Sequence, residues 1–497
     1  MKNFNKLILI IGALFGLMAC NDAIEIDQPG RLDADAAFEN VSDLEAGLFG
    51  VYDNFDVTPE IAFSSVFTDE LAIGFDSGGQ GLADYGFVLN AGSTAPEIFW
   101  VRGYAALNAV NRLIEAAEFI IPENAEEQAL YNQILGEAYA LRAWGHHKML
   151  KYFSTDLSDD SALGVIILDF VPTIDQQLLR STNGEVYDLI EGDLATAANL
   201  LGSSTVDKTR INQDFITALR ARIAAYREDY TAAANFSQQL IDDYPLANRA
   251  EYEAMFLDTS DGEVIFKLER TIGDNYDGQG VTGSPAAGGW AGARFAFVDA
   301  TLTGSPYFEM GRSLFNLLDP SDIRYTVNIA PTSVIDPDYE TNQNAARDIL
   351  VIQKYPGSEG QPLMNDLKVF RVSEMYLIRA EAYVANNQLD QAASLIKAIR
   401  DARFGTATVA PVFSSQQEAY DAILDERRVE LAFEGHRYID LKRLGQRAGQ
   451  GVEKDPVDCA FNGACTLPAD DYRFTLPLPI VEFNANPDLR EQQNPGY

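Results

Sequence analysis

The sequence predicts a mainly α fold, in which helix pairs form a scaffold and a loop-rich face contains short strands. Apolar residues recur at helical spacing through several long segments. Long stretches rich in glycine and polar residues separate these segments. Hydrophobic residues make up 47% of the 497-residue chain and charged residues 22%, so the chain has the composition of a globular protein with a large core.

The helical segments follow one another along most of the chain. In 99–119, for example, Tyr104, Leu107 and Val110 fall on one helical face. The expected helices are, in order, 99–119, 128–153, 184–201, 215–227, 230–241, 372–385, 389–402 and 416–433. Residues 264–268 and 349–355 are predicted to form short strands.

Two of these helix pairs have similar sequences. Residues 218–226 and 376–383 are both alanine-rich, and each is followed by a polar turn and then an Ala-Ala pair, at 232–233 and 392–393. Small residues at helical spacing let antiparallel helices approach closely. Stacked units of this kind resemble tetratricopeptide repeats, whose period is about 34 residues. The pairs are scattered rather than tandem, so a regular solenoid is not expected.

Three stretches have the composition of long loops, at 56–98, 270–312 and 328–365. Loops longer than about 15 residues in compact proteins are usually functional or disordered. The aromatic residues in the first two stretches favour an ordered surface.

The N-terminus has the features of a lipoprotein signal peptide. Lys2 and Lys6 precede an apolar run of about eleven residues (7–17), well short of the roughly 20 that span a bilayer. The run ends in Leu-Met-Ala-Cys, so we expect residues 1–19 to be removed and Cys20 to carry lipid, although Met18 departs from the usual small residue. Two or more acyl chains anchor a protein stably. The alternative is an ordinary secreted protein in which Cys20 is incidental.

The charge balance and the remaining cysteines exclude some functions. The net charge is −37, which disfavours nucleic-acid binding because that depends on Lys and Arg at phosphates. Such a negative charge is typical of proteins that stay soluble in salty water, and the alternative is that it serves to bind cations or cationic substrates. Cys459 and Cys465 flank a short loop with an Asn-Gly turn, where an exported chain can form a disulfide. The histidines and cysteines lack the spacing of a metal site, so we expect no metal and no cofactor.

Three blocks in the C-terminal third carry a family resemblance. The first is 368–377 with the Ala-Glu-Ala of 380–382, and the second is 425–443. The third comprises the Leu-Pro-Ile of 478–480, Glu482, the Asn-Pro of 486–487 and the ending Gln-Asn-Pro-Gly-Tyr. With the lipoprotein start and Trp100, Tyr104, Asn108 and Asn111, these blocks resemble the SusD/RagB family over essentially the whole chain after residue 19.

The resemblance implies one domain over residues 20–497, with an N-terminal part at about 20–230 and a C-terminal part at about 260–497. It implies a lipoprotein of the outer membrane, and the acidic residues after Cys20 resemble a signal for the cell exterior in Bacteroidetes. Such a protein captures an oligosaccharide or polysaccharide and delivers it to a SusC-like TonB-dependent transporter. The alternatives are a peptide-binding lipoprotein of the RagB branch, a lipid-anchored hydrolase and a periplasmic scaffold.

The sequence shows no nucleophile elbow, phosphate loop or metal-ligand cluster, so we predict that the protein is not an enzyme. The charged block from Glu426 to Asp440 could suggest a catalytic carboxylate pair. However, residues three and four apart on a helix form ion pairs along one face. An arginine beside each carboxylate also lowers its pKa, which is the wrong direction for a general acid.

The candidate ligand contacts lie mainly in the first two loop stretches. A sugar binder needs exposed aromatic rings for apolar ring faces and polar side chains for hydroxyls. Trp290 has no helical face to bury it and is the leading candidate for a stacking platform. The other candidates are Asn275, Tyr276, Asp277, Arg294 and Phe297 beside it, and Phe75, Asp76, Gln80, Tyr85 and Trp100 in or after the first loop. We expect the two loops to converge on one face, although each aromatic could instead simply pin its own loop.

Overall fold

The computed structural model describes residues 38–497 apart from residue 174 and the segments 203–206, 275–288, 296–305 and 343–346. The predicted signal peptide, Cys20 and the candidates Asn275, Tyr276, Asp277 and Phe297 lie outside the described residues. The fold is mainly helical, as the sequence predicts, and its strands are short and paired two by two. Within the described ranges, every helix is too short or too polar to cross a bilayer.

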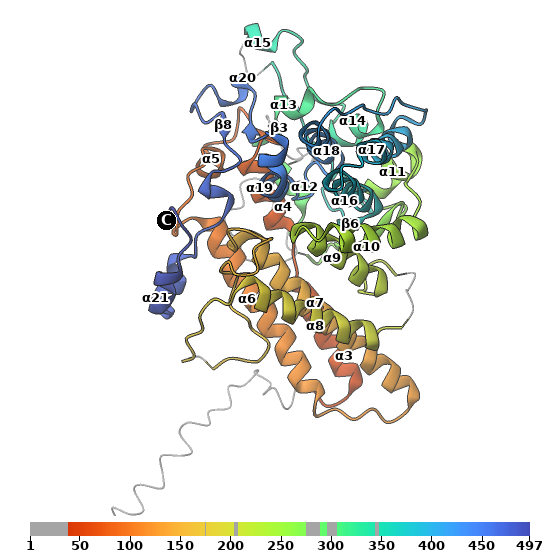
Figure 1. Cartoon of the computed structure of the whole chain (residues 1–497), viewed down its shortest axis with the longest axis vertical. Helices are drawn as coiled ribbons and strands as arrows, with labels where there is room; N and C mark the ends of the chain where they lie inside the picture. Colours follow the sequence, from red (N-terminus) through yellow and green to blue (C-terminus); the bar gives the residue numbers. More distant parts are fainter. Residues whose placement is uncertain (1–37, 174, 203–206, 275–288, 296–305, 343–346) are drawn as a thin grey trace, which may run out of the picture.

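Long antiparallel helices form one half of the molecule, in the lower part of Figure 1. The helices α6 (Thr94–Ala117) and α7 (Ala125–Phe153) run side by side, and α3 (Val41–Asp53) and α8 (Asn183–Leu200) pack against α7. Local sequence fixes where they begin, because the Asn124 side chain accepts the first backbone N–H groups of α7. Thr182 starts α8 in the same way.

Helix pairs form the other half, on the right of Figure 1. One pair is α9 (Gln213–Tyr226) with α10 (Tyr230–Asp243), and the other is α16 (Val372–Ala385) with α17 (Leu389–Phe404). Within each pair the chain turns between the two helices, at Glu228 in the first pair and at Asn387 in the second, where the φ values are 62° and 57°. The helix α10 packs against α16, so pairs that are far apart in sequence stack directly, as the resemblance to tetratricopeptide repeats suggests.

The pairs are followed by α18 (Gln416–Glu430) and α19 (Arg437–Ala448). Antiparallel strand pairs join β1 (Leu71–Ile73) to β3 (Phe308–Met310), β2 (Val264–Leu268) to β6 (Leu367–Arg371), β4 (Gly357–Ser358) to β5 (Gln361–Pro362) and β7 (Val452–Glu453) to β8 (Thr466–Leu467). The remaining elements are α4 (Thr58–Phe67), α5 (Leu82–Tyr85), α11 (Arg249–Phe256), α12 (Ala291–Phe295), α13 (Arg312–Phe315), α14 (Ile323–Asn328), α15 (Tyr339–Asn342), α20 (Pro456–Cys459), α21 (Ile480–Ala485) and the 3-10 segments Tyr472–Phe474 and Pro487–Gln492.

The charged block at the end of α18 forms a buried ion network. Glu430 accepts hydrogen bonds from Arg371 Nη1 at 2.8 Å and from Arg403 Nε at 3.0 Å. These arginines come from β6 and α17, so the ion pairs join different elements. The expectation that they run along one helix face is therefore wrong for Glu430. Within residues 425–443, all of which the structure describes, only the pair of Asp440 and Arg443 joins residues three apart on one helix. The block is buried, and its charges therefore need partners from the elements packed around it.

Candidate ligand-binding site

In the first loop stretch, the segment between β1 and α5 presents polar and aromatic side chains to solvent. Its base is fixed because β1 pairs with β3 and the backbone N–H of Gly74 donates to the carbonyl of Tyr307 at 2.9 Å. Phe75 is 64% exposed, and Asp76 and Gln80 are exposed as well. The loop then bends sharply at Gly81, whose φ is 70° and where a Cβ would lie 2.8 Å from the Phe308 ring.

The second loop is described only in part, and its leading candidate is buried. Trp290 is 8% exposed, belongs to a small core with Ala293, Leu363 and Met364, and donates from Nε1 to the Thr271 carbonyl at 3.2 Å. The prediction of an exposed platform at Trp290 is therefore wrong for this structure, because a segment distant in sequence covers the ring. Arg294 is half-buried on α12.

Two other candidates are also core residues. Trp100 is buried, its ring packs against Phe153 at 4.8 Å between centroids, and its Nε1 donates to Glu482 at 2.9 Å. Tyr85 is fully buried under Phe461, and its hydroxyl donates to the Asp458 carbonyl at 3.1 Å. Neither ring is open to a ligand, so both predictions as contacts are contradicted.

The described flanks of the two loops adjoin each other. The strand β3, near the end of the second loop stretch (270–312), pairs with β1, which lies within the first (56–98). The helix α12 contacts both β3 and α4. Thr58 on α4 also donates from Oγ1 to the Gly289 carbonyl at 2.9 Å. This placement favours a shared face for the two loops.

A third segment, which the sequence did not assign to this face, lies against the first loop. Cys459 and Cys465 form a disulfide, as predicted, with their Cα atoms 5.2 Å apart. The loop that they close carries Phe461, which stacks on Tyr85 with ring centroids 5.8 Å apart. Figure 1 shows α5, α20 and β8 grouped at the same edge of the molecule. The Asn-Gly turn predicts the loop, but nothing local predicts that it reaches Tyr85.

Two carboxyl groups beneath this face have pKa values well above their ordinary range. Burial raises the pKa of Glu309 to about 8 and that of Asp458 to about 7. Each accepts a backbone N–H, Glu309 from Leu350 at 3.2 Å and Asp458 from Arg312 at 2.7 Å. Both groups therefore support the strands and turns that carry the loops.

These acids predict how stability depends on pH. A group whose pKa is raised by folding takes up a proton in the folded state, so its contribution to stability falls as pH rises from about 5 to about 8. We expect the unfolding free energy of the protein to fall over this range, and Glu309→Gln to reduce the fall because an amide does not titrate. Urea unfolding at several pH values measures both, with the exposed Glu253→Gln on α11 as control. An equal fall in Glu309→Gln and in the control would contradict this assignment.

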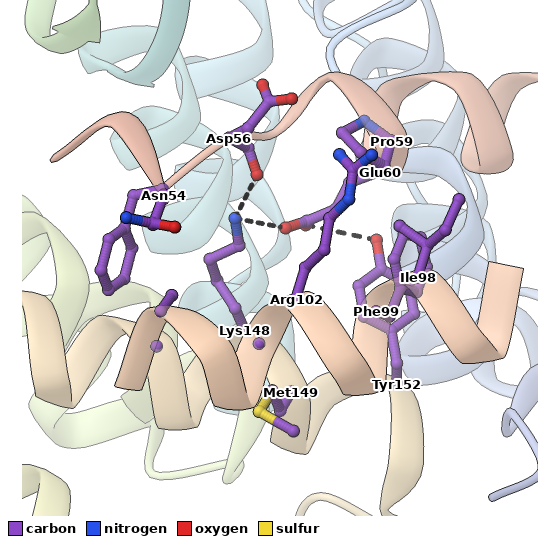
Figure 2. A pocket seen from close by; sticks show the side chains of 14 residues that line it. Asn54, Asp56, Pro59, Glu60, Ile98, Phe99, Arg102, Lys148, Met149 and Tyr152 are labelled. Carbon is purple, nitrogen blue, oxygen red and sulfur yellow. Dashed lines mark hydrogen bonds and ion pairs between the residues drawn. The ribbon is translucent and has the colours of Figure 1, made fainter. Parts of the chain in front are cut away.

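The pocket in Figure 2 lies between the start of α4, α6 and α7, and has an empty volume of about 540 Å³ including its open mouth. Phe55, Phe99 and Met149 form apolar walls. Lys148 lies between two acidic residues, with Nζ 2.5 Å from the Asp56 carbonyl and 3.0 Å from Glu60 Oε1.

The carboxylates of this pocket are held by cations. Burial alone would raise the pKa of Glu60, but Lys148 and Lys151 outweigh it and lower the pKa to about 2. Asp56 pairs with Arg270 at 2.6 Å. A general acid must hold a proton near neutral pH, so Glu60 is unsuited to that role.

Two family models match the chain, one in each half. The model described as the SusD family matches residues 337–497, and the model described as starch-binding associating with the outer membrane matches residues 82–224. SusD-like protein P2 of Formosa agariphila is 24% identical over 552 residues that cover 100% of both chains. The starch-binding protein SusD of Bacteroides thetaiotaomicron is 31% identical over 146 residues, 28% of this chain and 24% of that one.

The chain belongs to the SusD/RagB family. Solved structures have the same fold. A SusD superfamily protein from Bacteroides thetaiotaomicron has a TM-score of 0.74 at 23% identity, covering 92% of this chain and 100% of that one. A SusD-like carbohydrate binding protein from Bacteroides vulgatus has a TM-score of 0.68 at 21% identity, covering 92% and 98%.

The candidate contacts of this SusD/RagB member lie largely outside the matched regions. Phe75, Asp76 and Gln80 precede residue 82, and the second loop falls between 224 and 337. Tyr85 and Trp100, which lie inside a matched region, are buried, and so is Trp290, which lies outside both regions. The exposed residues of the first loop therefore lie outside the regions that the two family models match.

Proposed function

We propose that this protein is a glycan-binding lipoprotein of the bacterial outer membrane, anchored through Cys20 and facing the cell exterior. It captures an oligosaccharide and delivers it to a SusC-like TonB-dependent transporter. The match to a family described as starch-binding and associated with the outer membrane supports this proposal. A relative named as a starch-binding protein and a structural neighbour named as carbohydrate binding point to the same ligand class.

The observation that carries the proposal is the exposed first loop. A pyranose ring has an apolar face surrounded by hydroxyl groups, so it pairs with an aromatic ring next to hydrogen-bonding side chains. Phe75 offers such a ring, and Asp76 and Gln80 on the same loop are exposed to solvent. Because β1 and β3 fix the base of the loop, these groups are held ready for a ligand.

Binding without catalysis is the simplest chemistry for this site. The carboxylates of the Figure 2 pocket are neutralised by lysine and arginine. The two acids whose pKa is raised by burial, Glu309 and Asp458, each accept a hydrogen bond from the backbone. We therefore assign these acids to the scaffold and not to hydrolysis of the ligand.

An array that carries both glycans and peptides tests the ligand class. The protein lacking residues 1–20 should bind a restricted set of glycans and no peptide. Binding to peptides alone would replace this proposal with the peptide-binding function of the RagB branch.

A further inference from the structure

The disulfide-closed loop presents an aromatic ring whose position is fixed from several sides. Phe461 is 56% exposed although its ring stacks on Tyr85 at an interplanar angle of 17°. Tyr85 is itself buried and held by its hydrogen bond to Asp458. Phe461 therefore rests on a rigid support while more than half of its surface stays open to solvent.

The backbone around Phe461 is tied down as firmly as the ring. The strands β7 and β8 pair at the base of the loop, and the backbone N–H of Lys454 donates to the Cys465 carbonyl at 2.9 Å. Inside the loop, Gly463 N donates to the Cys459 carbonyl at 2.8 Å. The Asn462 side chain accepts the Ala464 N–H at 3.0 Å. The disulfide closes the same short segment. A ring held in this way loses little conformational entropy when it binds a ligand.

The loop also lies on the same face as the first candidate loop. The helix α20, which leads into it, contacts β1, and Asn462 Nδ2 comes within 3.8 Å of the position that a Cβ on Gly86 would take. Asn462 is exposed, and while its Oδ1 accepts a backbone N–H, its amide N–H groups can serve a ligand hydroxyl. An aromatic ring and a hydrogen-bond donor thus come from neighbouring residues of this loop.

We propose that the loop 459–465 is a second saccharide subsite, in which Phe461 stacks on a pyranose ring and Asn462 bonds its hydroxyls. The disulfide serves this subsite by holding the ring in place. This inference rests on the proposed function, since it adds a subsite to the same glycan-binding face.

The test measures the affinity of purified variants for the best glycan found on the array. Phe461→Ala should weaken binding roughly 5- to 150-fold, by analogy with stacking of bases on aromatic residues. Phe461→Tyr should restore affinity because it keeps the ring. Phe119→Ala serves as control, since Phe119 is 79% exposed on the turn between α6 and α7, at the opposite end of the molecule from α5 (Figure 1).

A redox measurement gives a second, independent readout. Reduction of the wild-type disulfide should weaken binding in the same direction as Phe461→Ala, with no further loss in Phe461→Ala itself. Unchanged affinity in Phe461→Ala, while Phe75→Ala loses affinity, would overturn the second subsite and leave the proposed function intact. Failure of the wild-type protein to bind any glycan would overturn the proposed function and this subsite together.

Discussion

Replacing Glu430 by alanine is expected to destabilise the protein by about 3–5 kcal/mol, the cost of removing one partner from a buried ion network. Glu430 is fully buried and accepts bonds from Arg371, Arg403 and Arg324. Burial alone would raise its pKa, but Arg403 and Arg371 outweigh it and hold the pKa well below its usual range. The variant leaves three buried guanidinium groups short of a counter-charge.

Unfolding in urea, followed by circular dichroism, measures this effect. The exposed Glu253→Ala on α11 is the matched control and should change stability by less than about 0.5 kcal/mol. Because the pKa of Glu430 is lowered in the folded state, its contribution to the unfolding free energy is present at neutral pH and is lost as pH falls into the acid range. Equal stability of the two variants would show that the network contributes no more than a surface charge.

Replacing Phe75 by alanine is expected to lower the affinity for the glycan ligand by about 1–3 kcal/mol, which corresponds to roughly 5- to 150-fold in Kd. The physical reason is loss of the exposed ring on which a pyranose face stacks. Titration calorimetry of the folded variant measures the change.

The control for Phe75→Ala is Phe119→Ala, which removes an even more exposed ring from the far turn between α6 and α7. It should bind the glycan as tightly as the wild type does. A wild-type Kd in Phe75→Ala, or an equal loss in both variants, would remove the first loop from the binding site.

Much of the helical scaffold could be predicted from hydrophobic spacing. The expected helix at 184–201 is α8 (Asn183–Leu200), and the expected strand at 264–268 is β2. The helix at 416–433 ends early, at Glu430, because the chain turns through Phe433 and Gly435, whose φ values are 61° and 84°. The helix α19 after this turn was missed because its charged residues obscure the apolar face that it buries.

The candidate site was harder to predict because the burial of each candidate side chain depends on contacts with segments distant in sequence. Trp290 has no helical face of its own, yet Leu363 and Met364 cover its ring. Tyr85 belongs to a stretch whose composition predicts a loop, yet it ends the short helix α5, and Phe461 and the Asp458 carbonyl contact it. Phe75 and Gln80 are exposed, as expected of an ordered surface stretch, and their loop bends at Gly78, Gly79 and Gly81, whose φ values are positive. Local composition therefore indicates the loop-rich stretches only in part, since α4, β1 and α5 lie within 56–98, and it does not say which aromatic remains open.

The proposed function requires that this protein binds glycan and does not cleave it. The most direct measurement is calorimetric titration of the protein lacking residues 1–20 with its glycan ligand, followed by chromatography of the same ligand after prolonged incubation. We predict saturable binding and a ligand recovered at its original chain length. Shortened chains with new reducing ends, or no binding to any glycan, would contradict the claim.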